Sequence, residues 1–133
     1  MTFGEKLRNL RENRYLTQAE AAELCNVSSR MFAYYETGER LPARPEIIQD
    51  IMKAFEVSFE YLFSSEEAFE LEATQKYGSI GNKQAQAILK NADMMFAGGE
   101  LDEDAKDEMF RMLTELYFEA KKKSKEKYGR KDK

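Results

Sequence analysis

The chain has 133 residues, of which 35% are charged, and a formal net charge of −4. This length favours one or two small domains, and no apolar run approaches the ~20 residues that a membrane-spanning helix needs. The absence of histidine excludes Ser-His-Asp triads and His-ligated zinc, and one cysteine cannot build a thiolate metal site.

The single cysteine, Cys25, rules out an internal disulfide and fits a reducing cytoplasm, where we expect the protein to act. The N-terminus lacks the apolar segment of a signal peptide. Acidic side chains concentrate in the middle of the chain. Residues 1–63 carry 8 basic and 10 acidic groups, residues 64–120 carry 5 and 13, and residues 121–133 carry 8 and 2. The basic tail is either a solvated helix end or a contact for DNA phosphates.

A first helix is predicted over residues 3–13. Thr2 is followed three residues later by a glutamate, which is the spacing of a capping box. Phe3, Leu7 and Leu10 then recur at i, i+4 and i+7, the spacing of a helical apolar stripe. This helix therefore has one face for a core.

Two short helices joined by a tight turn are predicted between Thr17 and Gly38. Thr17 begins a second capping box, and Asn26 tolerates the left-handed backbone that a tight turn needs. Ser28 can cap the second helix, and Gly38 can end it. Phe32 and Tyr35 are expected to face inward. The side chains expected on the outer face of this second helix are Ser29, Arg30, Ala33 and Tyr34.

The remaining pattern is also helical. Pro42 and Pro45 mark a loop and a helix start, and helices are predicted over residues 44–55, 57–63, 64–77 and 82–97 and from Asp102 into the basic tail, with a break at residues 78–81. The apolar stripes of the last two helices contain Ala85, Ile88, Leu89, Ala92, Met95 and Phe96, and then Ala105, Met109, Met112, Leu113, Leu116, Tyr117 and Ala120. Methionine suits irregular interfaces, so residues 64–133 are expected to form a self-association module.

The sequence contains no motif that is typical of an enzyme active site. The glycines form neither a dinucleotide-binding nor a P-loop fingerprint. The acidic run from Asp102 to Asp104 lacks the spacing of a calcium loop and is interpreted as a helix cap. We therefore expect no catalytic site, no metal and no cofactor.

The stretch from Thr17 to Gly38 resembles the helix-turn-helix of the phage repressor and Cro family, also known as the xenobiotic-response-element family. The residues that carry the resemblance are Thr17, Gln18, Ala22, Val27, Ser28, Phe32, Tyr35, Glu36 and Gly38, with Leu7, Leu10 and Arg11 upstream and Arg40, Pro42, Val57, Ser58, Tyr61 and Leu62 downstream. The resemblance covers residues 1–63. It implies an all-α fold with a five-helix DNA-binding domain over residues 1–63. The amphipathic helices that follow are expected to form a smaller helical C-terminal oligomerisation module over residues 64–133.

The resemblance also implies roles for individual residues. Gln18 would bond a backbone phosphate, and Arg11 and Glu36 would form an ion pair between two helices. Two features depart from the family pattern. Tyr15 stands where many members have glycine, and the acidic Glu39 and the apolar Leu41 follow the recognition helix, where members often carry polar or basic residues. The residues expected to contact DNA are Gln18, Ser28, Ser29, Arg30, Tyr34, Arg40 and Arg44.

Arg30 lies on the exposed face near the start of the second helix, the end that approaches base edges in this motif. We expect its guanidinium to bond O6 and N7 of guanine, with a phosphate contact as the alternative. Tyr34, one helical turn later, is expected to reach an adjacent base or phosphate.

The sequence thus predicts a sequence-specific transcriptional regulator, most simply a dimeric repressor that reads a palindromic operator in the major groove. Two alternatives remain open: the antitoxin of a toxin–antitoxin pair that represses its own operon, and a protein-interaction adaptor that does not bind DNA. Expected partners are double-stranded DNA and a second copy of the chain, with an anti-repressor, a protease or a toxin as further candidates and no membrane.

Overall fold

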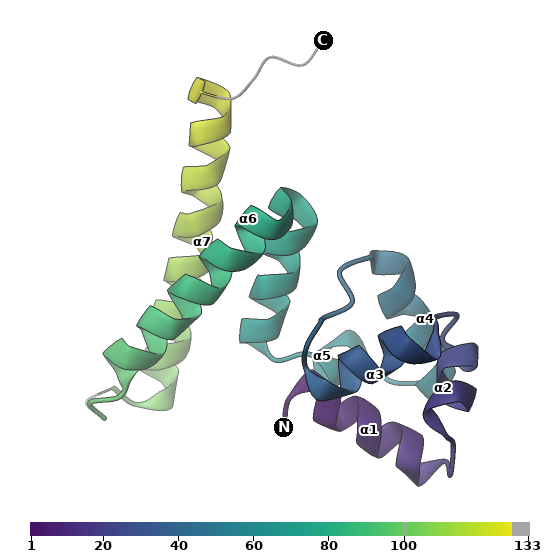
Figure 1. Cartoon of the computed structure of the whole chain (residues 1–133). Helices are drawn as coiled ribbons and strands as arrows, with labels where there is room; N and C mark the ends of the chain where they lie inside the picture. The colour runs from purple at the N-terminus through teal and green to yellow at the C-terminus, as the bar shows by residue number, and fades with distance from the viewer. Residues whose placement is uncertain (100, 129–133) are drawn as a thin grey trace. The chain divides into compact units, whose positions relative to one another are not determined.

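The computed structural model describes residues 1–99 and 101–128, and these residues form seven helices and no strand (Figure 1). The predicted all-α class is therefore confirmed. By packing, the chain divides into two compact units, residues 1–82 and residues 83–133, which we call the N-terminal and C-terminal units. The functional boundary expected after residue 63 stays a prediction. No helix within the described residues is long and apolar enough to cross a membrane.

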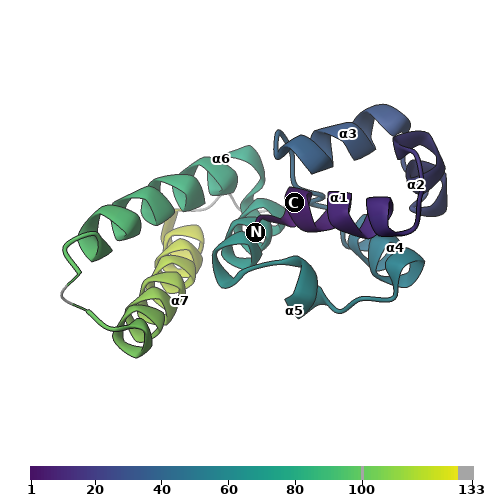
Figure 2. The same ribbon diagram turned by 90° about the horizontal axis from the view of Figure 1, so that it is seen from below.

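Five helices build most of the N-terminal unit, and Figure 2 shows α3 at its edge beside α1, with α4 and α5 on the opposite side of α1. Their bounds are α1 Phe3–Asn13, α2 Gln18–Leu24, α3 Ser29–Thr37, α4 Pro45–Phe55 and α5 Phe59–Leu62. The core beneath them is apolar and almost fully buried, although a domain of this size is near the lower limit for building such a core. Its largest members are Phe3, Leu7, Phe32, Tyr35, Ile51, Phe55 and Leu62.

The predicted helix starts are confirmed by hydrogen bonds at the caps. The hydroxyls of Thr2 and Thr17 each accept the backbone N–H three residues on, and the glutamate there accepts the cap's own N–H. The hydroxyl of Ser28 accepts the N–H of Met31 at 3.1 Å. Each bond satisfies a donor that the first helical turn would otherwise leave unpaired.

The links around α2 and α3 depend on left-handed backbone conformations. Tyr15, Asn26 and Gly38 have φ values of 57°, 60° and 85°. Gly38 adopts this conformation without strain, and asparagine tolerates it. Tyr15 occupies the position where the resembling family often has glycine, and its side chain is 94% exposed. The loop therefore keeps its left-handed geometry despite a residue that is poorly suited to it.

Helix α1 approaches α3 closely at Gly4. A Cβ atom at this position would lie 2.4 Å from the backbone oxygen of Glu36 and 2.6 Å from that of Tyr35. Only a residue without a side chain fits there, since backbone atoms of α3 cannot move aside as a flexible side chain could. Gly4 thus sets the spacing between the first helix and the end of α3.

Helix α6, Ser65–Phe96, bends sharply at Gly78, where φ is 67° and ψ is −149°. The predicted break over residues 78–81 is therefore present but shorter, because the helix resumes immediately. The two parts of α6 pack closely against each other across this bend. A Cβ at Gly81 would lie only 2.2 Å from the backbone oxygen of Ala73. The Asn82 amide donates hydrogen bonds to the side chains of Glu70 and Thr74, both at 3.0 Å.

The first part of α6 belongs to the N-terminal unit. The Glu67 carboxylate accepts the backbone N–H of Phe3 at 2.9 Å, and the Gln75 amide donates to the carbonyl of Ala43 at 2.8 Å. These bonds fix the first part of α6 to the N-terminal end of α1 and to the loop before α4.

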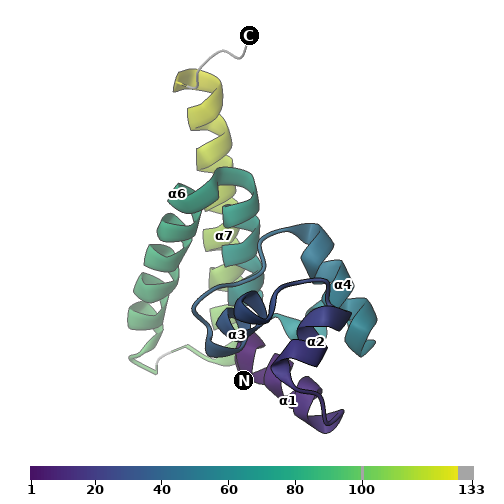
Figure 3. The same ribbon diagram turned by 45° about the vertical axis from the view of Figure 1, so that its right-hand side comes forward.

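The C-terminal unit contains the end of α6 and the helix α7, Glu103–Tyr128, which run antiparallel as a hairpin (Figure 3). Asp102 caps α7 as predicted, because its carboxylate accepts the N–H of Ala105 at 2.8 Å. The hydroxyl of Tyr117 donates to the side-chain oxygen of Gln84 at 2.8 Å and ties the two helices.

Not every residue of the predicted apolar stripes is buried. Ala85 and Ala92 are buried, but Met95 is 58%, Met112 58% and Leu116 67% exposed. Met95 lies at the edge of the α6 stripe, whose centre runs through Ala85, Ala92 and Phe96, so it turns away from the hairpin. The last five residues of the basic tail lie outside the described residues.

Candidate DNA interface

The outer face of α3 carries the candidate base-reading residues. Phe32 and Tyr35 point into the core, while Ser29 and Arg30 are exposed and Tyr34 is half-buried. Their positions follow from the 3.6-residue period of the helix, which places Arg30 and Tyr34 one turn apart on the same face. The predicted division of α3 into an inner and an outer face is therefore confirmed.

Arg30 is held along the side of Tyr34. Its Nε donates a hydrogen bond to the Tyr34 hydroxyl at 3.1 Å, and its guanidinium carbon lies 5.8 Å from the ring centroid. A cation at this distance from an aromatic ring is attracted by the ring quadrupole. Because Nε is engaged by Tyr34, the terminal Nη1 and Nη2 groups of Arg30 are the ones that remain for DNA.

Arg40 approaches the same ring from the loop after α3. Its guanidinium carbon lies 5.4 Å from the Tyr34 ring centroid. Its backbone N–H reaches the Tyr34 carbonyl at 3.4 Å, after Gly38 has turned the chain in its left-handed conformation. Tyr34 therefore brings together two cationic side chains that the sequence separates by ten residues, and we call these three residues the Tyr34 cluster.

Sequence reasoning did not find this role for Tyr34. The i, i+4 spacing of Arg30 and Tyr34 was a usable signal, since such side chains are neighbours on a helix. The approach of Arg40 had no comparable signal because it depends on the path of an irregular loop. Arg44, the last residue before α4, is exposed on that same loop.

Gln18 is the first residue of α2, and its amide is already engaged. Its Nε2 donates to Oε1 of Glu36 at 3.0 Å. An amide nitrogen carries two N–H donors, so one remains for a phosphate. The expectation that Gln18 bonds a phosphate stays a prediction, now with an orientation fixed by Glu36.

Glu36 is the centre of a buried charged network. Its side chain is 0% exposed, and Arg11, 14% exposed, places Nε 2.6 Å from Oε2 and a second nitrogen 3.2 Å from Oε1. The predicted ion pair is confirmed and is bidentate. Arg11 also donates to the carbonyl of Leu16 at 3.0 Å, so its role here is structural. Arg8, which sequence reasoning did not assign, adds a longer contact of 3.5 Å to Oε1 of Glu36.

The network keeps Glu36 ionised. Burial alone raises the pKa of a carboxyl, but the hydrogen bonds from Arg11 and Gln18 outweigh it and hold the pKa of Glu36 below its usual value. The bond to Glu36 correspondingly raises the pKa of Arg11. The pair therefore stays charged at neutral pH and fixes the first turn of α2, with Gln18, against the end of α3.

Ser28 and Cys25 have roles inside the motif. The Ser28 hydroxyl accepts a hydrogen bond as the cap of α3, and its own O–H can still donate a hydrogen bond to DNA.

Cys25 is fully buried in the core at the end of α2, and burial, together with the nearby Asp50, raises the pKa of its thiol to about 11. Such a thiol is a packing group rather than a nucleophile.

The chain is similar to known regulators. The family described as the helix-turn-helix domain matches residues 2–60. The HTH-type transcriptional regulator ImmR of Bacillus subtilis (strain 168) is 27% identical over 105 residues, which cover 78% of this chain and 82% of that protein. The HTH-type transcriptional activator BcrR of Enterococcus faecalis is 35% identical over 80 residues, which cover 60% of this chain but only 39% of the activator. No solved structure matches the chain.

Proposed function

We propose that α3 is the recognition helix of this chain, whose residues 2–60 match the helix-turn-helix domain family and which is similar to two HTH-type transcriptional regulators. In this motif the N-terminal part of the second helix enters the major groove, where every base pair has a distinct pattern of donors and acceptors. The exposed residues at that end of α3 are Ser29 and Arg30, next to Ser28.

The observation that carries this proposal is the Tyr34 cluster. Arg30, with Nε engaged by Tyr34, presents its two terminal nitrogens, and this fork matches O6 and N7 of guanine. Arg40 and Arg44 on the following loop, and the remaining N–H of Gln18, would bond phosphates on either side. Phosphate contacts fix the register, and base contacts select the sequence.

We further propose that the chain acts as a dimer and as a repressor. A two-fold dimer binds half-sites about one helical turn apart, ~34 Å, or a multiple of this spacing. Repression needs only that the dimer occupy promoter DNA, whereas activation also needs a surface that recruits polymerase. A promoter–reporter pair with the site placed over or upstream of the polymerase-binding region would measure the direction of the effect.

Selection of bound duplexes from a random pool with the full chain tests the DNA-binding proposal. We expect enrichment of a two-fold symmetric sequence, with an affinity that falls as salt concentration rises. Arg30→Ala in the same selection should relax the preference at one position of each half-site. Recovery of unenriched sequence by the full chain would overturn the proposal.

A further inference from the structure

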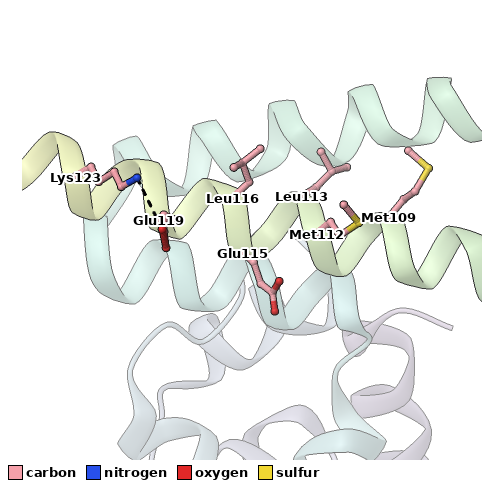
Figure 4. Close-up of a pocket in the computed structure, with 7 residues that line it drawn as sticks. All are labelled: Met109, Met112, Leu113, Glu115, Leu116, Glu119 and Lys123. Atoms are coloured by element: carbon pink, nitrogen blue, oxygen red, sulfur yellow. Dashed lines mark ion pairs between the residues drawn. The ribbon is translucent and has the colours of Figure 1, made fainter.

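Helix α7 exposes an apolar face in the C-terminal unit. Met112 is 58% and Leu116 is 67% exposed, and the half-buried Met109 and Leu113 continue the same strip. These four residues, which we call the α7 strip, line an open groove of ≈ 470 Å³ (Figure 4). Single exposed apolar residues are ordinary, but a continuous strip along one helix face is typical of a protein interface.

The charges of the same helix are divided between its two ends. The acidic side chains before and beside the strip are Asp102, Glu103, Asp104, Asp107 and Glu108, and the basic ones after it are Lys121, Lys122, Lys123 and Lys125. Both groups are largely exposed, and the Lys123–Glu119 pair within the helix is long, at 3.9 Å. Lys106 and Arg111 lie among or just after the acidic side chains, and Glu115 and Glu119 line the groove beside the strip. The net charge of the helix is therefore negative before the strip and positive after it.

We propose that the partner of the α7 strip is α7 of a second copy, packed antiparallel about a two-fold axis near Leu113. This inference rests on the dimer of the proposed function and names its interface. Antiparallel packing sets the basic end of each helix against the acidic end of the other. A parallel pair would instead place like charges together at both ends, which opposes association.

The position of the axis follows from the spacing along the helix. With the axis near Leu113, Leu116 of one copy lies beside Met109 of the other, and Lys123 lies beside Asp102. The apolar centre is thereby covered by an equal apolar centre, as a two-fold interface requires. Two hairpins joined in this way form a four-helix bundle, in which helices pack at about 20° around a shared core.

Sedimentation of the full chain tests whether the α7 strip is the interface. Leu116→Glu places a charge at the apolar centre and should weaken dimerisation about tenfold or more, because an unpaired charge is costly to bury. Met94→Glu is the matched control, since Met94 is also exposed, at 68%, but lies on α6. We expect this control to remain dimeric. A monomeric wild-type chain at tens of micromolar, or equal effects of the two variants, would overturn the interface.

Oxidative cross-linking tests the orientation. Lys123→Cys and Asp102→Cys should each remain uncross-linked alone and form a disulfide-linked dimer when mixed, because these positions lie on the strip face and only the antiparallel pair brings them together. The native Cys25 is buried and does not compete. Self-cross-linking of Lys123→Cys, or no cross-link in the mixture, would overturn the antiparallel arrangement. Both experiments use no DNA, so a dimer of this kind that binds no operator would refute the proposed function alone.

Discussion

The guanidinium of Arg11 in α1 and the carboxylate of Glu36 in α3 form a two-bond ion pair inside the N-terminal unit, with Nε 2.6 Å from Oε2. The same carboxylate accepts the amide of Gln18, which begins α2. The Glu36 carboxylate thus connects α1 and α2 to α3, the helix that carries the candidate base-reading residues.

Removing the carboxylate should destabilise the fold without touching the outer face of α3. Glu36→Ala leaves Arg11 partly buried without its partner, which we expect to cost about 2–4 kcal/mol of unfolding free energy. Urea unfolding measures the change. Arg8→Ala is the control, because Arg8 is exposed and its contact to Glu36 is longer, so its loss should cost under about 1 kcal/mol. A double-mutant cycle of Arg11→Ala with Glu36→Ala that gives additive costs would contradict the coupling.

The same pair predicts a pH dependence. The pKa of Glu36 is lowered in the folded protein, so its contribution is complete above its ordinary pKa, 4.5, and is lost as the pH falls through the lowered folded value. The stability difference between wild type and Glu36→Gln should therefore be constant from pH 7 to about pH 5 and shrink in more acidic solution. Urea unfolding at a series of pH values measures it, and a difference that grows on acidification would show that the carboxylate is not held ionised.

Gly4→Ala should be strongly destabilising, since the added methyl group would meet two backbone oxygens of α3 at 2.4 and 2.6 Å. Overpacking of this kind costs about 1–3 kcal/mol. Gly98→Ala is the matched control, because nothing lies within 4 Å of the added atom and its φ is not left-handed. Thermal unfolding of the two variants should separate them clearly; similar melting temperatures would mean that α1 can shift away from α3.

On the selected operator, Arg30→Ala is expected to cost ~1–3 kcal/mol of binding and to relax the preference at one half-site position. Gln18→Ala should weaken all duplexes more evenly, because a phosphate contact does not read sequence. Fluorescence anisotropy with operator and scrambled duplexes distinguishes the two patterns. An equal loss on both duplexes for Arg30→Ala would assign Arg30 to a phosphate.

Tyr34→Phe isolates the hydrogen bond that orients Arg30. The variant keeps the ring under Arg40 but removes the hydroxyl that accepts Arg30 Nε. We expect a loss of about 0.5–1.5 kcal/mol on the operator, the usual value of one hydrogen bond, and almost none on scrambled DNA. Substitution of 7-deazaguanine for the contacted guanine provides the control, since it removes N7 but keeps O6 and should therefore reduce the difference between wild type and variant.

The helices and caps of the N-terminal unit could be predicted because their signals are local. Capping boxes at Thr2 and Thr17, the cap at Ser28 and the stop at Gly38 all depend on neighbours within one helical turn. The Arg11–Glu36 pair was predicted from family resemblance rather than from spacing, and the structure adds Gln18 and Arg8 to it.

The features that sequence reasoning did not find depend on contacts between distant segments. Arg40 meets Tyr34 only because the loop after Gly38 folds back, and Gly4 is required only because α3 crosses α1 there. Met95 has the apolar character of a core residue, but a small rotation around α6 decides its exposure. Such placements are set by tertiary geometry, which periodicity does not encode.

The burial of Cys25 has a practical consequence. Burial raises the pKa of its thiol to about 11, so the thiol is almost wholly protonated at pH 7, and it lies in the core beside the candidate DNA-binding helices. A thiol reagent can therefore modify the folded chain only during the moments when this core opens. Because the chain has one cysteine, the rate at which a thiol reagent labels it reports how often the helix-turn-helix opens locally. The rate can be measured with and without DNA, and no introduced label is needed.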